Sequence, residues 1–312
     1  MFQYIADICT YNLFRLESGT ALASSVNFFI YDVLKIAFSI LLVITLISFL
    51  RTYISPKKIK RLLSRQRFGI GYLIAAIFGA ISPFCSCSSI PFFIGFLEAG
   101  VPMGVAFAFL ITSPLVNEII FVLMLGTFGP KVAFTYAGFG ILLGVTCGMI
   151  LQQTNLKHDI IKLDKPESLA EMPQDLQGKL KFAYAETAWI FKKVFPFILI
   201  GVGIGAIIHG YVPTQLITQY IKSESIFAVP LAVIIGVPLY AGCSTLVPVV
   251  FAFTQKGIAI GTALAFMMAI AGLSFPEAII LKSVMRLRLL LVFFGIVALG
   301  IMAVGYLFNF LF

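Results

Sequence analysis

Six long apolar segments dominate this sequence and restrict what it can fold into. A helix of about 20 apolar residues is long enough to cross the ~30 Å hydrocarbon core of a bilayer. Only 11% of the residues are charged, whereas soluble domains carry about 25%. The sequence therefore predicts an all-α integral membrane protein with several spans: Val33–Leu50, Val101–Leu125, Val132–Leu151, Ala188–Ile208, Ile258–Leu281 and Leu289–Leu311.

Two further apolar segments, Gly69–Leu97 and Val229–Thr254, are interrupted by proline, cysteine, serine and glycine. The interruptions lie at Ser82–Pro91 and Pro238–Pro248. The arms on either side are too short to cross a bilayer alone. Non-helical backbone at membrane depth persists only where protein or a water-filled cavity satisfies it. We therefore expect two broken re-entrant hairpins whose tips face an internal pathway, with thin full spans as the alternative.

The second half of the chain repeats the order of the first: a span, a hairpin and two spans. Cys87–Ser89 precedes Pro91 in the first hairpin, and Cys243–Thr245 precedes Pro248 in the second. Because three spans carry the chain to the opposite side, the second repeat is expected to be inverted. Inverted repeats with interrupted helices are typical of secondary transporters. We expect four parts: an N-terminal segment at 1–27, a first repeat at 28–151, a linker at 152–187 and a second, inverted repeat at 188–312.

The basic residues indicate the orientation in the membrane. Clusters in Arg51–Arg67, in the linker and in Lys282–Arg288 all fall on one side of this topology. The positive-inside rule places that side in the cytoplasm. Both termini are then extracytoplasmic, and the N-terminal segment lies on the surface of the bacterial inner membrane. Topology rather than nucleic-acid binding thus explains the net charge of +9.

Three cysteines, Cys85, Cys87 and Cys243, lie at the two predicted hairpin tips. Opposed hairpins would bring these thiols together near the membrane centre. Thiolates bind soft ions such as copper(I), zinc or trivalent arsenic, so we predict that they are ligands of a metal or metalloid substrate. Buried packing cysteines are the alternative. Neighbouring hydroxyl groups would bind a polar or anionic substrate or cap the hairpin arms: Ser86, Ser88, Ser89, Ser244 and Thr245.

Two acidic residues, Glu118 and Glu277, lie in corresponding spans, each close to a proline. A charged side chain inside a span costs roughly 2.5–3.5 kcal/mol on insertion scales. We predict that both acids couple transport to protons or ions, and that Asn117 contributes to the substrate site. The alternative is a position at the membrane interface or a pair with a cation such as Lys282.

These motifs resemble the bacterial predicted-permease family that includes the organoarsenical efflux permeases of arsenic-resistance operons. The resemblance is carried by Pro83–Ser88, Ser113–Glu118 and Gly242–Thr245, and it covers the chain except the N-terminal segment. It implies an inner-membrane permease that exports trivalent organoarsenicals, with Cys85 and the two other tip cysteines as substrate thiols.

The sequence favours a secondary-active permease that exports a small thiophilic solute, such as a trivalent organoarsenical or a soft metal ion, in exchange for protons. Its expected partners are the lipid bilayer, this solute and further copies of the chain, without nucleic acid or cofactor. One alternative is a transporter of a sulfur-containing or other small anion. Another is a membrane-embedded thiol oxidoreductase that uses Cys85 and Cys87. The sequence contains no Walker A loop and no nucleophile elbow, so an ATP-driven pump or a hydrolase is not expected.

Overall fold

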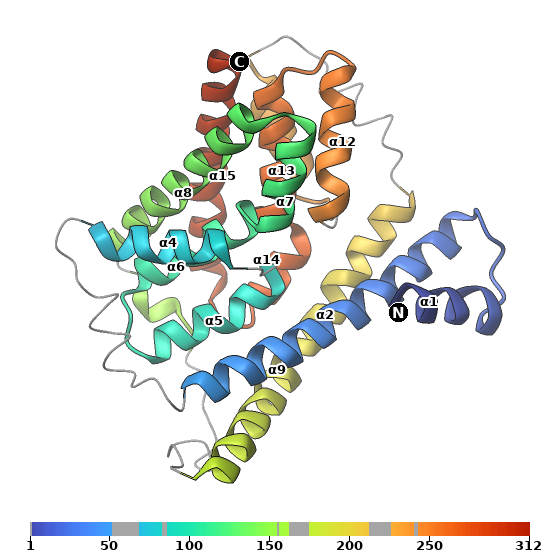
Figure 1. Cartoon of the computed structure of the whole chain (residues 1–312), viewed down its shortest axis with the longest axis vertical. Helices are drawn as coiled ribbons and strands as arrows, with labels where there is room; N and C mark the ends of the chain where they lie inside the picture. Colours follow the sequence, from blue (N-terminus) through green and yellow to red (C-terminus); the bar gives the residue numbers. More distant parts are fainter. Residues whose placement is uncertain are drawn as a thin grey trace.

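The computed structural model describes residues 2–51, 69–82, 86–154, 156–161, 175–211, 226–239 and 243–312. Nearly all of these residues are helical (Figure 1). The predicted basic loop after Arg51 and the centre of the predicted linker lie outside the described residues.

The first half begins with α1 (Phe2–Asp7), which continues into a π-helical turn, η1 (Ile8–Leu13). The helices that follow are α2 (Ala21–Arg51), α4 (Ile70–Ile81), α5 (Ser86–Glu98), α6 (Met103–Leu115), α7 (Glu118–Thr127) and α8 (Pro130–Gln153). After a short 3₁₀ turn, η3 (Lys157–Asp159), the second half contains α9 (Leu176–Tyr211), α11 (Ala228–Gly236), α12 (Cys243–Gln255), α13 (Ile260–Leu273), α14 (Phe275–Leu281) and α15 (Leu287–Leu311). The order of long, short and broken helices in the first half thus recurs in the second.

Four helical segments among the described residues are long and apolar enough to cross a membrane. They are Ala21–Phe38, Pro130–Gln153, Ile260–Leu281 and Leu287–Leu311, and two bent helix pairs raise the number to as many as six. The prediction of a helical, multi-spanning membrane protein is therefore confirmed. The predicted hairpin arms, α4 and α5, have 12 and 13 residues, or roughly 18–20 Å at the α-helical rise, which is too short for a full span.

Two of the predicted spans are not continuous. Val101–Leu125 consists of α6 and α7, which meet at 42°. Ile258–Leu281 is interrupted at Ser274, which has extended backbone angles between α13 and α14. Asn117 starts the new helix because its side chain accepts a hydrogen bond from the backbone N–H of Ile120 at 2.8 Å. Both segments were predicted as spans, and the breaks within them were not predicted from the sequence.

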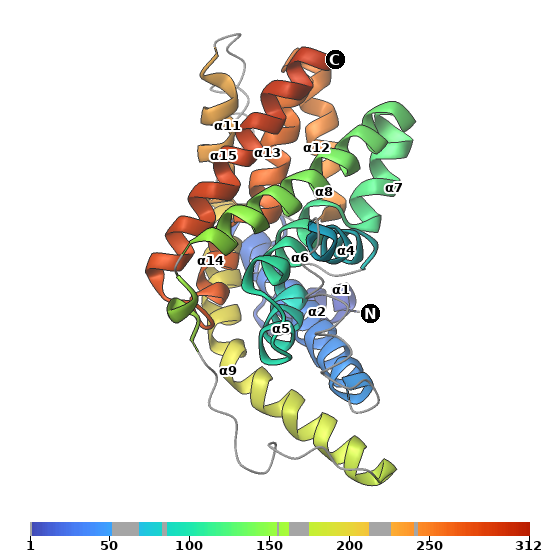
Figure 2. The same ribbon diagram turned by 90° about the vertical axis from the view of Figure 1, so that its left-hand side faces the viewer.

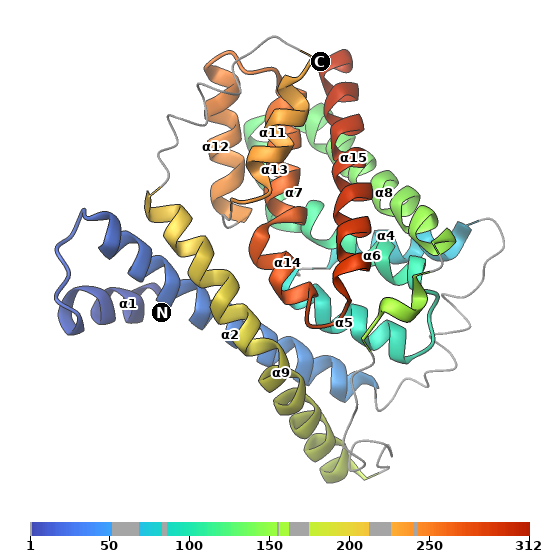
Figure 3. The ribbon, with the colours of Figure 1, turned by 180° about the vertical axis from the view of Figure 1, so that it is seen from behind.

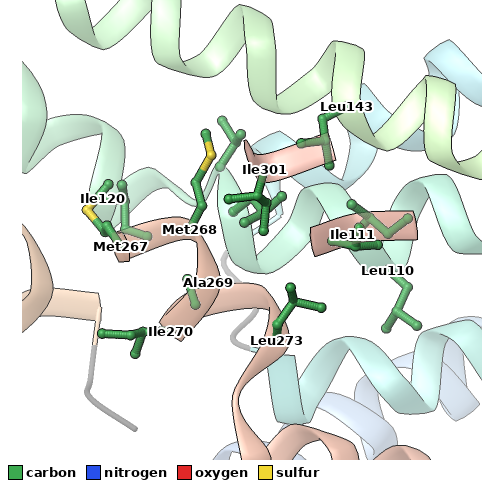
Figure 4. Close-up of a cluster of buried hydrophobic side chains, with 14 of the residues drawn as sticks. Leu110, Ile111, Ile120, Leu143, Met267, Met268, Ala269, Ile270, Leu273 and Ile301 are labelled. Atoms are coloured by element: carbon green, nitrogen blue, oxygen red, sulfur yellow. The ribbon is translucent and has the colours of Figure 1, made fainter. Parts of the chain in front are cut away.

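The centre of the protein is built around α6, in which every residue is buried, and α13, in which every residue after Ile260 is buried. These two helices pack against each other, and their apolar side chains meet those of α8 and α15 (Figure 4). Helices α2 and α9 pack along one another beside this central group, with α1 against α2 (Figures 1 and 3). A helix that is apolar on all sides is expected to be buried among other helices.

Equivalent contacts recur in the two halves. The backbone N–H of Gly104 donates to the side chain of Gln152 at 2.7 Å, and that of Gly261 donates to the side chain of Asn309 at 2.8 Å. A common shift in residue number takes Gly104 to Gly261 and Gln152 to Asn309. It also relates Gly100 to Gly257, which turn the chain with φ of 77° and 86°. Each half thus packs its central helix against its last helix in the same way.

Candidate functional site

The predicted hairpin tips lie where α5 and α12 begin. Ser86, Cys87 and Ser88 form the first turn of α5, and Cys243–Thr245 form the first turn of α12. Their side chains, and all of Cys85, lie outside the described part of the structure. Ser89 is fully buried. The meeting of the three thiols therefore stays a prediction, whereas the two helix starts that carry them are defined.

The correspondence between the two hairpins is one residue away from the sequence-based pairing of Cys87 with Cys243. The shift that matches Gly104 with Gly261 also matches Pro91 with Pro248. It pairs Ser86 with Cys243, and Cys87 with Ser244. The first tip turn thus has serine followed by cysteine, and the second has cysteine followed by serine.

The break between α6 and α7 is stabilised by side chains. Asn117 is 4% exposed and caps α7. The hydroxyl of Tyr136 on α8 donates at 2.8 Å to the carbonyl oxygen of Leu115, which ends α6. Polar side chains and neighbouring helices commonly satisfy the backbone groups that a broken membrane helix frees.

The break between α13 and α14 is stabilised differently. The backbone N–H of Phe275 donates to the carbonyl oxygen of Val237, just after α11, at 2.9 Å. Gly201 of α9 lies so close to Pro276 that an added Cβ would be 3.0 Å from the proline Cα. Glu277 follows this contact and is 2% exposed. Packing of α9 against α14 thus holds a carboxyl group in the protein interior.

The two breaks touch each other. A Cβ added to Gly272, shortly before Ser274, would lie 3.1 Å from the side chain of Leu115. Helices α7 and α12 run side by side from the centre toward the same end of the molecule, where Phe128 and Phe251 pair at 5.4 Å (Figures 1 and 3). Helix α5 packs against α14 in turn. The starts of α5, α7, α12 and α14 therefore gather near the centre of the protein.

This arrangement brings hydrogen-bonding groups to the centre of the protein. Each break ends one helix and begins another, so carbonyl and N–H groups of helix ends both occur at the centre. Ser274 is buried at the second break, and Thr112 and Ser113 are buried before the first. Among the residues that the structure describes, no group of three or more His, Cys, Asp or Glu side chains could hold a metal ion.

The acidic residues are placed unequally. Glu118 is exposed in the first turn of α7, whereas Glu277 is buried. They are not equivalent, since the common shift pairs Glu118 with Phe275. Two buried acids were missed by sequence reasoning: Asp32 in α2 is 6% exposed and Glu186 in α9 is 0% exposed. The signal available in the sequence was the position of each acid just before a long apolar segment.

Comparisons with known proteins agree with a membrane location. A family model described as a predicted permease matches residues 21–310. A UPF0718 protein of Methanocaldococcus jannaschii is 22% identical over 76% of this chain and 81% of its own length. The UPF0718 protein YcgR of Bacillus subtilis is 27% identical over 73% of this chain and 77% of its own.

A third relative, from Streptococcus mutans, is named as a two-component membrane permease complex subunit. It is 27% identical over 58% of this chain and 60% of its own length. No solved structure matches this chain.

Proposed function

Because this chain belongs to the predicted-permease family, we propose that it is a secondary-active permease. It exports a small thiophilic solute, such as a trivalent organoarsenical or a soft metal ion, in exchange for protons. The observation that carries this proposal is the contact between two broken helices, α6–α7 and α13–α14, at the centre of the protein. In secondary transporters, broken helices near the bilayer midplane form the substrate site.

The proposal includes inverted repeats, because equivalent residues of the two halves touch each other. Leu115 is equivalent to Gly272 and Leu143 to Gly300, and both pairs are in contact. Residues meet their own equivalents where a two-fold axis passes between them. A pseudo-two-fold axis therefore fits between α6 and α13 and between α8 and α15.

The direction of α8 relative to α15 supports inversion. Phe139 of α8 pairs with Phe308 of α15 at 5.5 Å. Further along α8, the sulfur of Cys147 lies 3.9 Å from the carbonyl oxygen of Ile296. Residue numbers rise along α8 as those of its contacts fall along α15, so the helices are antiparallel (Figure 2). Two parallel repeats would pair these helices in the same direction.

The packing of α2 and α9 against the centre is unequal and supports alternating access. Helix α14 packs closely against α9, whereas no comparable packing joins the equivalent helices α7 and α2 in the described part of the chain. A second state follows from the pseudo-symmetry: α2 packs against α7 and α9 withdraws from α14. Exchange of two such states opens the central site to one side at a time.

The proposed substrate site combines thiols, hydroxyls and an amide from both halves. The thiols select a soft substrate, and the hydroxyl groups and helix ends bind its polar atoms. The residues are Cys85, Ser86, Cys87, Ser88, Ser89, Asn117, Cys243, Ser244 and Thr245, with Glu118 and Glu277 as coupling acids. The gathering of four helix starts also favours the second candidate, a sulfur-containing or other small anion.

The proposed location is the inner membrane, with repeats at 28–151 and 188–312, a cytoplasmic linker at 152–187 and extracytoplasmic termini. Besides lipid, solute and protons, the partner is a second subunit, because a relative is named as a complex subunit.

Accumulation measurements in cells test the substrate. Cells that express the protein should retain less methylarsenite than cells without it, and the serine variants of Cys85, Cys87 and Cys243 should each abolish the difference. Serine is similar in size to cysteine but replaces a soft ligand with a hard one. The matched control is Cys9→Ser, which removes a thiol from the N-terminal π-helical turn.

Normal export by all three serine variants would contradict the thiol site. If thiosulfate rather than methylarsenite is then transported, the anion permease is the correct function.

A further inference from the structure

We propose that Asp32 and Glu186 are an equivalent pair of proton-binding carboxyl groups, one in the first helix of each half. The inference rests on the proposed function, because it assumes transport through two related halves. It adds coupling residues that the sequence motifs do not contain.

The equivalence follows from the buried faces of α2 and α9, whose register differs by three residues from the shift that relates the later helices of the two halves. In each helix an acid is followed at the same spacings by two buried isoleucines and one further buried residue. A repeat of the same buried positions indicates that the helices present corresponding faces to the interior. The matching residues are Asp32, Ile36, Ile44 and Ser48 in α2, and Glu186, Ile190, Ile198 and Val202 in α9.

Helix ends do not explain these two acids. Glu118 lies in the first turn of α7, where the positive end of the helix dipole stabilises a carboxylate. Asp32 and Glu186 lie deep within α2 (Ala21–Arg51) and α9 (Leu176–Tyr211), and the dipole acts only within the first turn. An ionised carboxylate inside an apolar helix is costly, and protonation removes that cost.

The two acids lie toward opposite ends of the α2–α9 pair. The hydroxyl oxygens of Thr45 and Thr187 are 3.1 Å apart, and Phe29 packs beside Gly203, so the helices are antiparallel. This register places Glu186 beside the part of α2 that follows Thr45. Its level is then about 14 residues, or roughly 21 Å, from that of Asp32. One carboxyl group therefore lies closer to each membrane face.

Among the residues that the structure describes, one further buried acid lies on the helices around this pair. Lys35, one turn from Asp32, is exposed and lies 5.5 Å from the ring of Tyr31. Asp7 of α1 accepts hydrogen bonds from Gln3 and Asn27. The described charged side chains on α2, α9 and the helices that pack against them are Asp7, Lys35, Lys179, Lys181, Lys192 and Glu277. Glu277 is the one buried member of that set, so it is the natural third carrier of a proton between the two acids.

This distribution suggests how the pair works. Each half exposes its acid to one side of the membrane when the central site opens to that side. A proton bound from outside at Asp32 and released inside at Glu186 would drive the exchange of states. Both groups then share one chemistry, reversible protonation of a carboxylate, without any covalent change.

Carbodiimide labelling tests protonation directly and needs no substrate. Dicyclohexylcarbodiimide adds to protonated carboxyl groups in apolar surroundings, and mass spectrometry locates the adduct. With full-length protein in liposomes near neutral pH, we expect adducts at Asp32 and Glu186, decreasing as the pH rises. Exposed Glu17 is the internal control and should stay unlabelled. Absence of label at both acids across the pH range, with intact protein, would overturn the inference.

Transport in proteoliposomes tests coupling, with methylarsenite as the probe. Asp32→Asn and Glu186→Gln should each lower uptake driven by a pH gradient by roughly 5–150-fold, the usual range of coupling between two ligands. The rate at which labelled methylarsenite exchanges for unlabelled methylarsenite at equal pH should stay close to that of wild type. A misfolded variant would lose this exchange as well. Glu17→Gln is the matched control and should change neither rate.

The outcomes separate this inference from the proposed function. If both variants retain uptake driven by a pH gradient, the coupling role is refuted, but the proposed function as a permease is not. Failure of the wild-type protein to move methylarsenite would refute the substrate, whereas the labelling result would still decide the protonation of both acids. A sodium gradient that drives uptake in place of a pH gradient would identify the wrong cation and refute proton coupling.

Discussion

Substitution of Gly104 by alanine should separate α6 from α8. The Cβ of the new side chain would overlap the carbonyl oxygen of Gly148 and lie 2.6 Å from the Cβ of Gln152. The obstructing atoms include backbone, so the helices must move apart. The hydrogen bond from Gly104 to Gln152, 2.7 Å long, would lengthen as they do.

The expected loss of stability combines two terms. Overpacking in a well-packed interior costs typically 1–3 kcal/mol, and a weakened buried hydrogen bond costs about 1 kcal/mol more. The total of roughly 2–4 kcal/mol should lower Tm by on the order of 5–10 °C. Gly261→Ala should have a similar effect, because its Cβ would overlap the carbonyl oxygen of Gly305 and crowd Asn309.

Scanning fluorimetry of the purified protein in detergent measures these shifts. Matched controls are Gly138→Ala and Gly295→Ala in α8 and α15, where no atom lies within 4 Å of the added Cβ. Those two changes should leave Tm unchanged or raise it slightly, because alanine favours helix by about 1 kcal/mol over glycine. Equal stability of the Gly104 and Gly138 variants would refute the close packing of α6 on α8.

Three further substitutions test the breaks and the moving helices. Asn117→Ala should cost about 1 kcal/mol through loss of the α7 cap, whereas Asn117→Asp should retain the cap; thermal unfolding compares them. Tyr136→Phe should cost about 1–3 kcal/mol, because the Leu115 carbonyl loses its donor, and full retention of Tm would contradict that role. Cysteines at Gly201 and Pro276 would have their Cβ atoms 3.2 Å apart, so a small outward movement brings them into the range of about 3.5–4.5 Å that a disulfide requires. The disulfide should stop transport until it is reduced. Transport at the normal rate with the disulfide intact would argue against exchange of the α9–α14 contact.

The sequence predicts the class of fold well because length and hydropathy determine which segments can cross a bilayer. The breaks at Asn117 and Ser274 escape this reasoning, since one or two polar residues scarcely change the mean hydropathy of a long segment. The residues that make the breaks were nevertheless visible: an asparagine before Glu118 is a helix-start signal. That signal competes with an apolar run that favours one continuous helix.

The buried acids escaped prediction for a related reason. Asp32 immediately precedes the apolar run that begins at Val33, and Glu186 shortly precedes Ala188. Each therefore reads as a residue at the membrane surface. Their burial depends on the pairing of α2 with α9, helices from opposite halves of the chain. Tertiary contacts of this kind are not contained in local hydropathy, and the same limit applies to the distance between the two hairpin tips.

The most direct test of the account is uptake of methylarsenite by everted inner-membrane vesicles, in which an exporter moves its solute inward. The account predicts rapid uptake in vesicles that contain the protein and are acidified inside. Uptake should be lost on addition of a protonophore and lost in the Cys243→Ser variant. Uptake equal to that of vesicles lacking the protein, measured with folded protein present, would contradict the proposal of a proton-coupled exporter of thiophilic solutes.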